Sequence, residues 1–118
     1  KKKKKKVLFC FSEKVSKIDN KQGKFKLPHI GWNALQYPPN RSHWQDSCLA
    51  GIQHGEFCYF VHSYMAVPEN PNHILAQCNY EGLAVTAAIG RDNVTGLQFH
   101  PERSGPHGLK ILKRFINH

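Results

Sequence analysis

The stretch Gly96-Leu97-Gln98-Phe99-His100-Pro101-Glu102-Arg103-Ser104-Gly105 decides the fold prediction. In it an apolar run that begins at position 94 ends in a histidine and a glutamate two positions apart, and a Ser-Gly-Pro break follows. Strand side chains alternate, so His100 and Glu102 are expected to point the same way if the chain stays extended through Pro101. The proline favours this geometry because it disfavours the helical region for the residue before it.

His100 and Glu102 suit one kind of chemistry. A carboxylate held beside an imidazole sets its tautomer and stabilises the imidazolium, as the base and its orienter do in a nucleophilic triad. A strand end with two polar residues at its rim explains the same spacing, because proline is ordinary turn chemistry. The spacing alone leaves both interpretations open.

The elements around this stretch predict a mixed α/β domain. Residues 74–78 and 83–89 form a hairpin with 79–82 as its turn, and 91–93 lead into the strand at 94–99.

After the motif the sequence predicts a helix with Ser104 as a candidate cap. Its apolar positions are Leu109, Leu112, Phe115 and Ile116, and the other face is basic.

Upstream, residues 57–64 form the strongest predicted strand. Its first five positions are apolar on both faces, which is typical of a central strand. It ends in His62-Ser63-Tyr64, and the carboxyl ends of strands are where ligands bind in open α/β sheets.

The N-terminal part is less strongly patterned. A short apolar run at 7–11 is followed by alternating segments at 15–18 and 24–27, which predict a hairpin turning at 20–23. Residues 37–54 are expected to form an external connection, with a helical turn at 47–52.

Composition bounds the class of protein. The chain of 118 residues fits one domain at most, or a piece of one, and its formal charge is +9. Six of its 17 basic residues are Lys1–Lys6, and without them 11 basic residues face 8 acidic ones. This run is expected to be a disordered tail or an artefact, with nuclear localisation or phosphate binding as the alternative. The charge therefore gives little support for nucleic-acid binding.

The four cysteines, Cys10, Cys48, Cys58 and Cys78, form no C-x-x-C pair, and the sequence has no apolar segment long enough to cross a bilayer. These features indicate reduced thiols in a cytoplasmic protein without a membrane partner.

A metal site is not expected. His54, Cys58 and His62 have helical spacing, but the segment between them is a predicted strand. Positions four apart on a strand lie about 13 Å from each other, too far to share one zinc ion.

A nucleophile for His100 is not evident. Each cysteine is expected to be buried and inert, and Cys48, which precedes Leu-Ala-Gly, is the least implausible exception.

Trp32 lies between Gly31 and Asn33. It is either a core residue or an exposed contact of the kind enriched at interfaces.

Three motifs carry a resemblance to a known family. Residues 28–33 (Pro-His-Ile-Gly-Trp-Asn), 59–64 (Tyr-Phe-Val-His-Ser-Tyr) and 96–105 come in the order and approximate spacing of the class I (triad) glutamine amidotransferases. Within that family they look most like the glutaminase subunits of imidazole glycerol phosphate synthase. The similarity runs from about Lys26 to the C-terminus.

The resemblance implies a flavodoxin-like α/β domain that hydrolyses glutamine through a cysteine, with ammonia passing to a cyclase in histidine biosynthesis. His100 would be the base and Glu102 its orienter, and Ser63 and Tyr64 would lie beside the bound glutamine. Trp32 would face the partner, a (β/α)8-barrel cyclase in a heterodimer. The resemblance implies no cofactor, metal or nucleic acid.

The chain also departs from the family. The nucleophile of the family lies in a Gly-x-Cys-x-Gly elbow that has no match here, and Arg103 stands where lysine is usual. Residues 7–118 are therefore expected to be the C-terminal portion of a single amidotransferase domain, inactive alone. Two alternatives are a related subunit that feeds a sugar-modifying synthase and a catalytically inactive interaction fragment.

Overall fold

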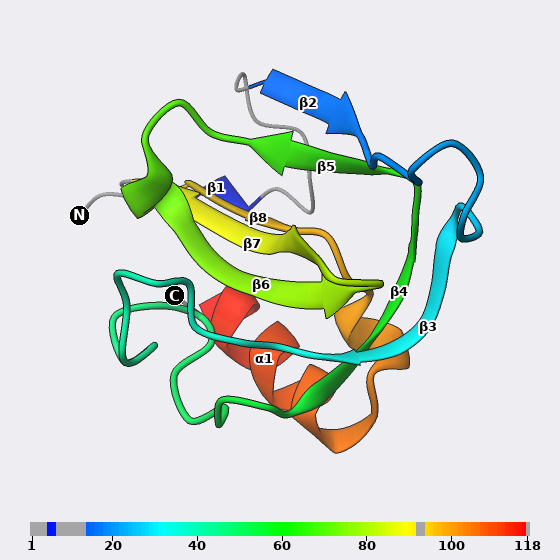
Figure 1. Ribbon diagram of the computed structural model, residues 1–118. Helices are drawn as coiled ribbons and strands as arrows, with labels where there is room; N and C mark the ends of the chain where they lie inside the picture. Colours follow the sequence, from blue (N-terminus) through cyan, green and yellow to red (C-terminus); the bar gives the residue numbers. More distant parts are fainter. Residues whose placement is uncertain (1–4, 7–13, 92–93, 118) are drawn as a thin grey trace.

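The computed structural model describes residues 5–6, 14–91 and 94–117 (Figure 1). Its strands are β1 (Lys5–Lys6), β2 (Lys14–Lys17), β3 (His29–Ala34), β4 (Phe57–His62), β5 (Tyr64–Val67), β6 (Ile74–Tyr80), β7 (Leu83–Arg91) and β8 (Val94–Leu97). Two short 3-10 helices, η1 (Pro71–His73) and η2 (Pro101–Arg103), and one helix, α1 (Gly105–Asn117), complete the described elements. This is an α/β arrangement of mixed strands with a C-terminal helix, as predicted.

The predicted hairpin over residues 74–89 is confirmed. Strands β6 and β7 pair antiparallel, and β8 continues the sheet on the other edge of β7. Glu81 and Gly82 join β6 to β7 with φ of 53° and 85°. Positive φ at both central positions is the geometry of a tight hairpin turn, and Asn79 Oδ1 accepts the N–H of Gly82 across it.

Strand β1 pairs parallel with β8, with Lys5 opposite Val94. Lys5 and Lys6 thus belong to a strand, and the expectation for the lysine run as a whole stays a prediction. The rest of that run and the predicted strand at 7–11 lie outside the described residues, as do Asp92 and Asn93 of the predicted turn.

The prediction of a central strand at residues 57–61 is wrong for the described structure. Strand β4 pairs antiparallel with β3 in a two-stranded sheet. Burial alternates along it, so that Cys58 and Phe60 are buried whereas Phe57 and Val61 are exposed. Because the exposed face of β4 is also apolar, its sequence cannot be told from that of a strand buried on both faces.

The hairpin predicted for residues 15–27 is also wrong. The first strand exists as β2, but it pairs antiparallel with β5, which follows β4 (Figure 1). Residues 24–27 form no strand. The turn at 20–23 instead leads toward β3, and Leu27–Pro28 is a cis peptide bond.

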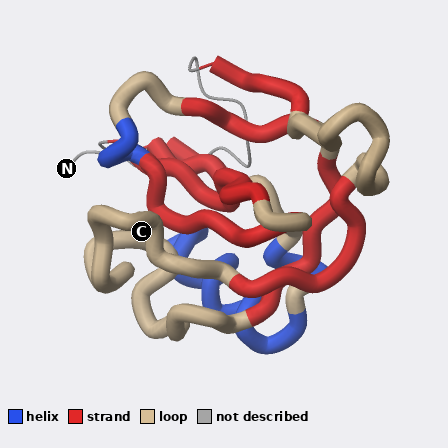
Figure 2. Tube along the Cα trace, in the orientation of Figure 1, coloured by secondary structure: helices blue, strands red, loops and turns tan. Residues whose placement is uncertain are grey.

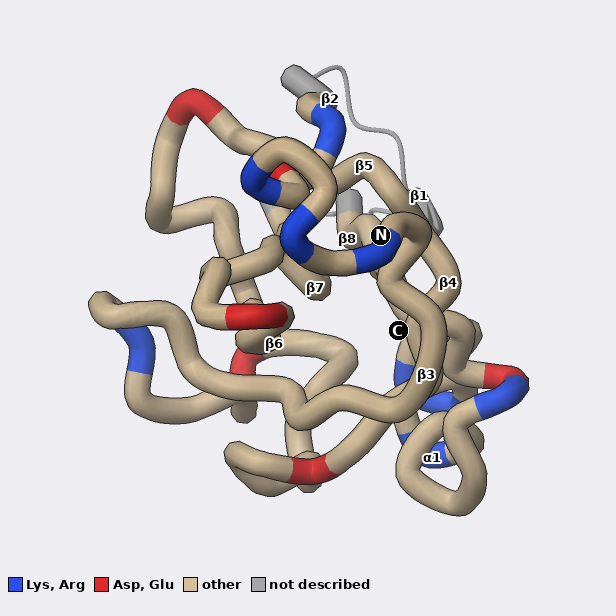
Figure 3. The backbone as a smooth tube through the Cα atoms, turned by 45° about the vertical axis from the view of Figure 1, so that its right-hand side comes forward, with Lys and Arg blue, Asp and Glu red and all other residues tan. Residues whose placement is uncertain are grey.

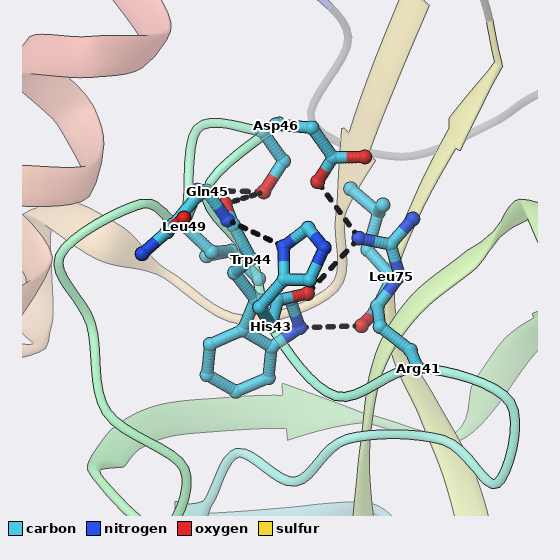
Figure 4. Close-up of polar contacts among 8 residues, drawn as sticks. Arg41, His43, Trp44, Gln45, Asp46, Leu49 and Leu75 are labelled. Atoms are coloured by element: carbon cyan, nitrogen blue, oxygen red, sulfur yellow. Dashed lines mark hydrogen bonds and ion pairs between the residues drawn. The ribbon is translucent and has the colours of Figure 1, made fainter.

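Residues 37–54 contribute to the core, contrary to the external connection predicted. They are loop and turn throughout, and an isolated bridge at position 36 precedes them (Figure 2). Trp44, Leu49 and Ile52 are nonetheless buried. The indole Nε1–H of Trp44 donates to the carbonyl of Leu75 on β6 at 2.6 Å, which fixes the loop against the sheet (Figure 4).

The helix predicted after the motif is confirmed as α1, but its buried face differs from the predicted one. Ile111 and Phe115 are buried, whereas Leu109 and Ile116 are exposed. Gly108 lies where the helix meets η2, and a Cβ at this position would stand 2.0 Å from the carbonyl oxygen of Pro101. Only glycine permits this approach.

Charged side chains do not form one continuous basic stripe on the described residues. Figure 3 colours the Lys and Arg positions along the backbone: one group lies on the stretch between β2 and β3, and another lies around α1. Among the described helices, none is long and apolar enough to span a membrane.

Candidate functional site

His100 and Glu102 form a close pair at the end of β8. His100 Nδ1 lies 3.0 Å from Glu102 Oε2, so the prediction that both point the same way is confirmed. The geometry behind it differs from the prediction. His100 is extended, with φ −101° and ψ 97°, but Pro101–Arg103 form η2 instead of a continued strand. Proline suits the first position of a helical turn because it has no N–H to satisfy there.

Two hydrogen bonds attach the segment that carries this pair to β4, and a third joins the two ends of the segment. The backbone N–H of His100 donates to Tyr59 O at 2.9 Å, and the N–H of Tyr59 donates to Ser104 Oγ at 2.9 Å. The Ser104 hydroxyl in turn donates to His100 O at 2.6 Å. Ser104, predicted as a cap of the helix, is 1% exposed. Its hydroxyl instead holds η2 against β4 through these two hydrogen bonds.

The polarity of the pair suits a base with its orienter. Partial burial raises the pKa of Glu102, but hydrogen bonds from the backbone and from His100 outweigh it, and the net shift is downward. Glu102 is therefore a carboxylate at neutral pH and accepts the Nδ1–H of His100. The neutral His100 then has its lone pair at Nε2, where it can take a proton.

The four residues predicted for catalysis and substrate binding line one cleft of about 440 Å³. His100 and Glu102 come from the segment after β8, and Ser63 and Tyr64 come from the junction of β4 and β5. Residues 86–89 of β7 also line it.

Trp32 lies apart from the cleft. It sits on β3, 54% exposed, with its ring centroid 5.8 Å from that of Tyr59 on β4. Trp32 is therefore not a core residue of the described structure, and its role as an interface contact stays a prediction.

The described cysteines are buried away from the cleft lining. Burial raises the pKa values of Cys48, Cys58 and Cys78 to about 12, so all three are thiols at neutral pH. Cys48 is thus no exception to the prediction of inert cysteines. Cys10 lies outside the described residues.

Three residues are candidate metal ligands by their spacing in the sequence: His54, Cys58 and His62. Cys58 and His62 lie on β4, while His54 is in the loop before it. Within the described parts of the chain no three metal-ligating side chains converge.

Sequence reasoning missed a buried histidine pair beside the cleft. His29 and His62 stand opposite each other on β3 and β4, with Nδ1 of His29 3.1 Å from Nε2 of His62. Burial, together with the neighbouring His62, lowers the pKa of His29 to about 4. Burial also lowers the pKa of His62. Both residues belong to motifs singled out in the sequence, but only the pairing of β3 with β4 brings them together.

Comparison with known proteins agrees with this geometry. A family model described as glutamine amidotransferase class-I matches residues 10–118. The chain is 41% identical over 112 residues to the imidazole glycerol phosphate synthase subunit HisH of Pelagibacter ubique, covering 95% of this chain and 51% of that protein. It is 48% identical over 91 residues to HisH 2 of Pseudomonas aeruginosa, covering 77% and 42%.

A third relative, HisH of Halobacterium salinarum, is 44% identical over 98 residues, covering 81% of this chain and 42% of that protein. The chain thus spans about half the length of the curated relatives it matches. The extent of the family match and the identities lead to one conclusion: this chain belongs to the class I glutamine amidotransferase family.

Proposed function

We propose that this chain is part of the glutaminase subunit of an imidazole glycerol phosphate synthase, which hydrolyses glutamine and supplies ammonia to a cyclase in histidine biosynthesis. The observation that carries the proposal is the His100–Glu102 pair, 3.0 Å apart, at a cleft that Ser63 and Tyr64 also line. The choice of acceptor is supported by the HisH relatives. Residues 7–118 would form the C-terminal portion of one amidotransferase domain, preceded by the lysine run.

In this proposal His100 is the base. Its Nδ1–H is held by Glu102, and its Nε2 takes the proton of a cysteine thiol that an earlier part of the domain contributes. The thiolate attacks the side-chain amide carbon of glutamine, and the imidazolium returns the proton to the departing ammonia. Water, deprotonated by the same imidazole, then cleaves the thioester and releases glutamate and the thiol.

Ser63 and Tyr64 would contact the bound glutamine. They line the same cleft as His100, and its volume of about 440 Å³ lies within the range of small-molecule sites. No cofactor or metal takes part in the proposed reaction.

The partner would be the cyclase, a (β/α)8 barrel in a cytoplasmic heterodimer, without nucleic acid or membrane. Its docking surface would be the β3–β4 face, which we define as the outward side chains Ile30, Trp32, Phe57 and Val61. All four are exposed, between 37% and 60%. Ile30 is directly opposite Val61 in the strand register, so the exposed apolar residues of the two strands are neighbours. A contiguous apolar patch of this kind is typical of an interaction site.

The test is glutamate release by the complete subunit assembled with its cyclase. His100→Asn and Glu102→Gln should each lower kcat by about 10²-fold or more, because general-base catalysis is lost or its tautomer is no longer fixed. His107→Asn is the matched control. His107 also pairs with a carboxylate, Glu56, at 3.0 Å, but lies on α1 outside the cleft lining. It should leave kcat unchanged.

The 118-residue chain alone should release no glutamate, since no described cysteine lines the cleft. Cysteine-dependent turnover by this chain alone, or full turnover by His100→Asn in the assembly, would contradict the proposal.

A further inference from the structure

The histidine pair is part of a directional chain of hydrogen bonds that ends at the cleft. His62 Nδ1 lies 2.9 Å from the carbonyl oxygen of Tyr64, and His62 Nε2 lies 3.1 Å from His29 Nδ1. His29 Nε2 lies 3.3 Å from the amide nitrogen of Asn33. The chain therefore runs from β3 across β4 to the first residue of β5, which lines the cleft.

The direction of every bond in this chain is fixed by its two ends. A carbonyl oxygen only accepts, so His62 carries its proton on Nδ1 and accepts at Nε2. His29 must then donate from Nδ1 and accept at Nε2, which suits the donating amide nitrogen of Asn33.

The orientation of the Asn33 amide is fixed independently. Its Oδ1 accepts the N–H of Ala34 at 2.7 Å, and its Nδ2 also donates to Asn79 O at 2.7 Å. A flipped amide would lose both bonds. Both histidines are thus neutral Nδ1–H tautomers, because an additional proton on either would bring two donors face to face.

We propose that His29 and His62 are positioning residues for the glutamine site, forming a neutral relay that holds the backbone of Tyr64 at the edge of the cleft. The other backbone acceptor at this edge, Ser63 O, is held separately by the N–H of Ile18 at 2.8 Å. The lowered pKa of each histidine accords with the neutral state. The inference rests on the proposed function for its substrate but not for the relay itself.

The first experiment determines the tautomers of His29 and His62 and does not depend on a measurement of enzyme activity. In the ¹⁵N-labelled complete subunit at pH 7, long-range proton–nitrogen spectra should give Nδ1–H imidazoles for both residues, assigned by loss of signals in His29→Phe and His62→Asn. An Nε2–H tautomer or an imidazolium at either position would overturn the relay.

The second experiment asks whether the relay serves substrate binding. In the assembled enzyme, His62→Phe should raise KM for glutamine about tenfold with a smaller change in kcat, as expected when a group that orients the bound substrate is lost. His62→Asn should recover most of this loss, because its amide nitrogen can donate in place of Nδ1. His107→Phe, on α1, should change neither constant.

The outcomes separate the two proposals. An equal loss in both His62 variants with a fall in kcat alone would overturn the positioning role. If the wild-type assembly releases no glutamate, the proposed function fails and the glutamine part of the inference with it. The tautomer spectra still decide the relay.

Discussion

At the scale of single residues, the burial of His29 makes the stability of the folded protein depend on pH. Its ring is 3% exposed and stacks between Phe60 and Tyr80, at centroid distances of 5.1 and 4.1 Å. Titratable groups close to the pair are Tyr80, which stacks on His29, and His100, whose protonated form would disfavour a second positive charge on His62. Protonating His29 in the folded protein would therefore place a charge between aromatic rings and set two hydrogen-bond donors against each other.

The stability of the folded protein should consequently fall with acidification. The pKa of His29 is about 4 in the folded protein, below its ordinary value of 6.5. Between these two pH values the unfolded chain binds a proton at His29 and the folded protein does not. The contribution of neutral His29 to the free energy of unfolding is fully present above pH 6.5 and is lost as the pH falls toward 4. The decline from pH 7 to pH 5 should be about 2 kcal/mol smaller in His29→Phe, which keeps a stacking ring without titrating. Urea unfolding at both pH values measures it, and an equal decline in both proteins would contradict the neutral state of His29.

The His100–Glu102 pair and the proposed histidine relay show which parts of a candidate site can be predicted from sequence. His100 and Glu102 are two residues apart, so their proximity is a local property that nearly any backbone after the strand preserves. It survived even though η2 replaced the extended geometry that the prediction assumed. His29 and His62 are 33 residues apart, and their contact depends on the β3–β4 register. That register was outside the reach of periodicity arguments.

At the scale of elements, α1 packs against η2, the short helix that contains Glu102 and follows His100. Gly108→Ala would place a Cβ 2.0 Å from Pro101 O and 2.7 Å from Ser104 Cβ. Backbone must move to relieve the first contact, which outweighs the better helix propensity of alanine. The variant should lose about 1–3 kcal/mol of unfolding free energy.

The adjacent exposed position provides the control for this variant. Leu109 is 59% exposed on the next residue of α1, and Leu109→Ala should change the unfolding free energy by about 0.5 kcal/mol or less. Chemical denaturation of both variants measures the difference. Equal stabilities would mean that α1 does not press on η2.

The loop over residues 37–54 makes a second prediction at this scale. Trp44 is 2% exposed, and its Nε1–H is bound to the carbonyl of Leu75 on β6. Trp44→Phe removes this donor and leaves a buried carbonyl unpaired, which should cost about 1–3 kcal/mol. Trp32→Phe, at the exposed tryptophan, should cost almost nothing. Urea denaturation followed by circular dichroism compares the two, and similar losses would contradict the anchoring role of Trp44.

Predictability of the elements follows from how local their signals are. The β6–β7 hairpin was predictable because alternation and turn residues occur within one short stretch. The pairing of β2 with β5 was not, because a strand segment next to a turn satisfies the same pattern as a hairpin. Trp44, Leu49 and Ile52 enter the core from turns without any period, so no repeat in the sequence identifies them.

At the scale of the whole molecule, the β3–β4 face stands out because it is apolar and uncovered by any described element. On the opposite side of the same two strands lie the buried His29 and His62. One two-stranded sheet thus carries the proposed docking surface outward and the relay to the cleft inward. A partner that shifts the register or twist of β3 against β4 would move Asn33 and the relay with it.

This arrangement makes Trp32 a test of assembly independent of folding. Trp32→Ala should weaken binding to the cyclase about 30-fold or more, as loss of a central interface tryptophan does. Because its side chain is 54% exposed, the unfolding free energy of the isolated subunit should change by about 0.5 kcal/mol or less. Leu109→Ala removes a similarly exposed apolar side chain from α1 and should leave the affinity unchanged. Calorimetric titration with the cyclase measures both variants. If they bind alike, the docking surface lies elsewhere, because exposed apolar area alone would then not distinguish the β3–β4 face from the outer side of α1.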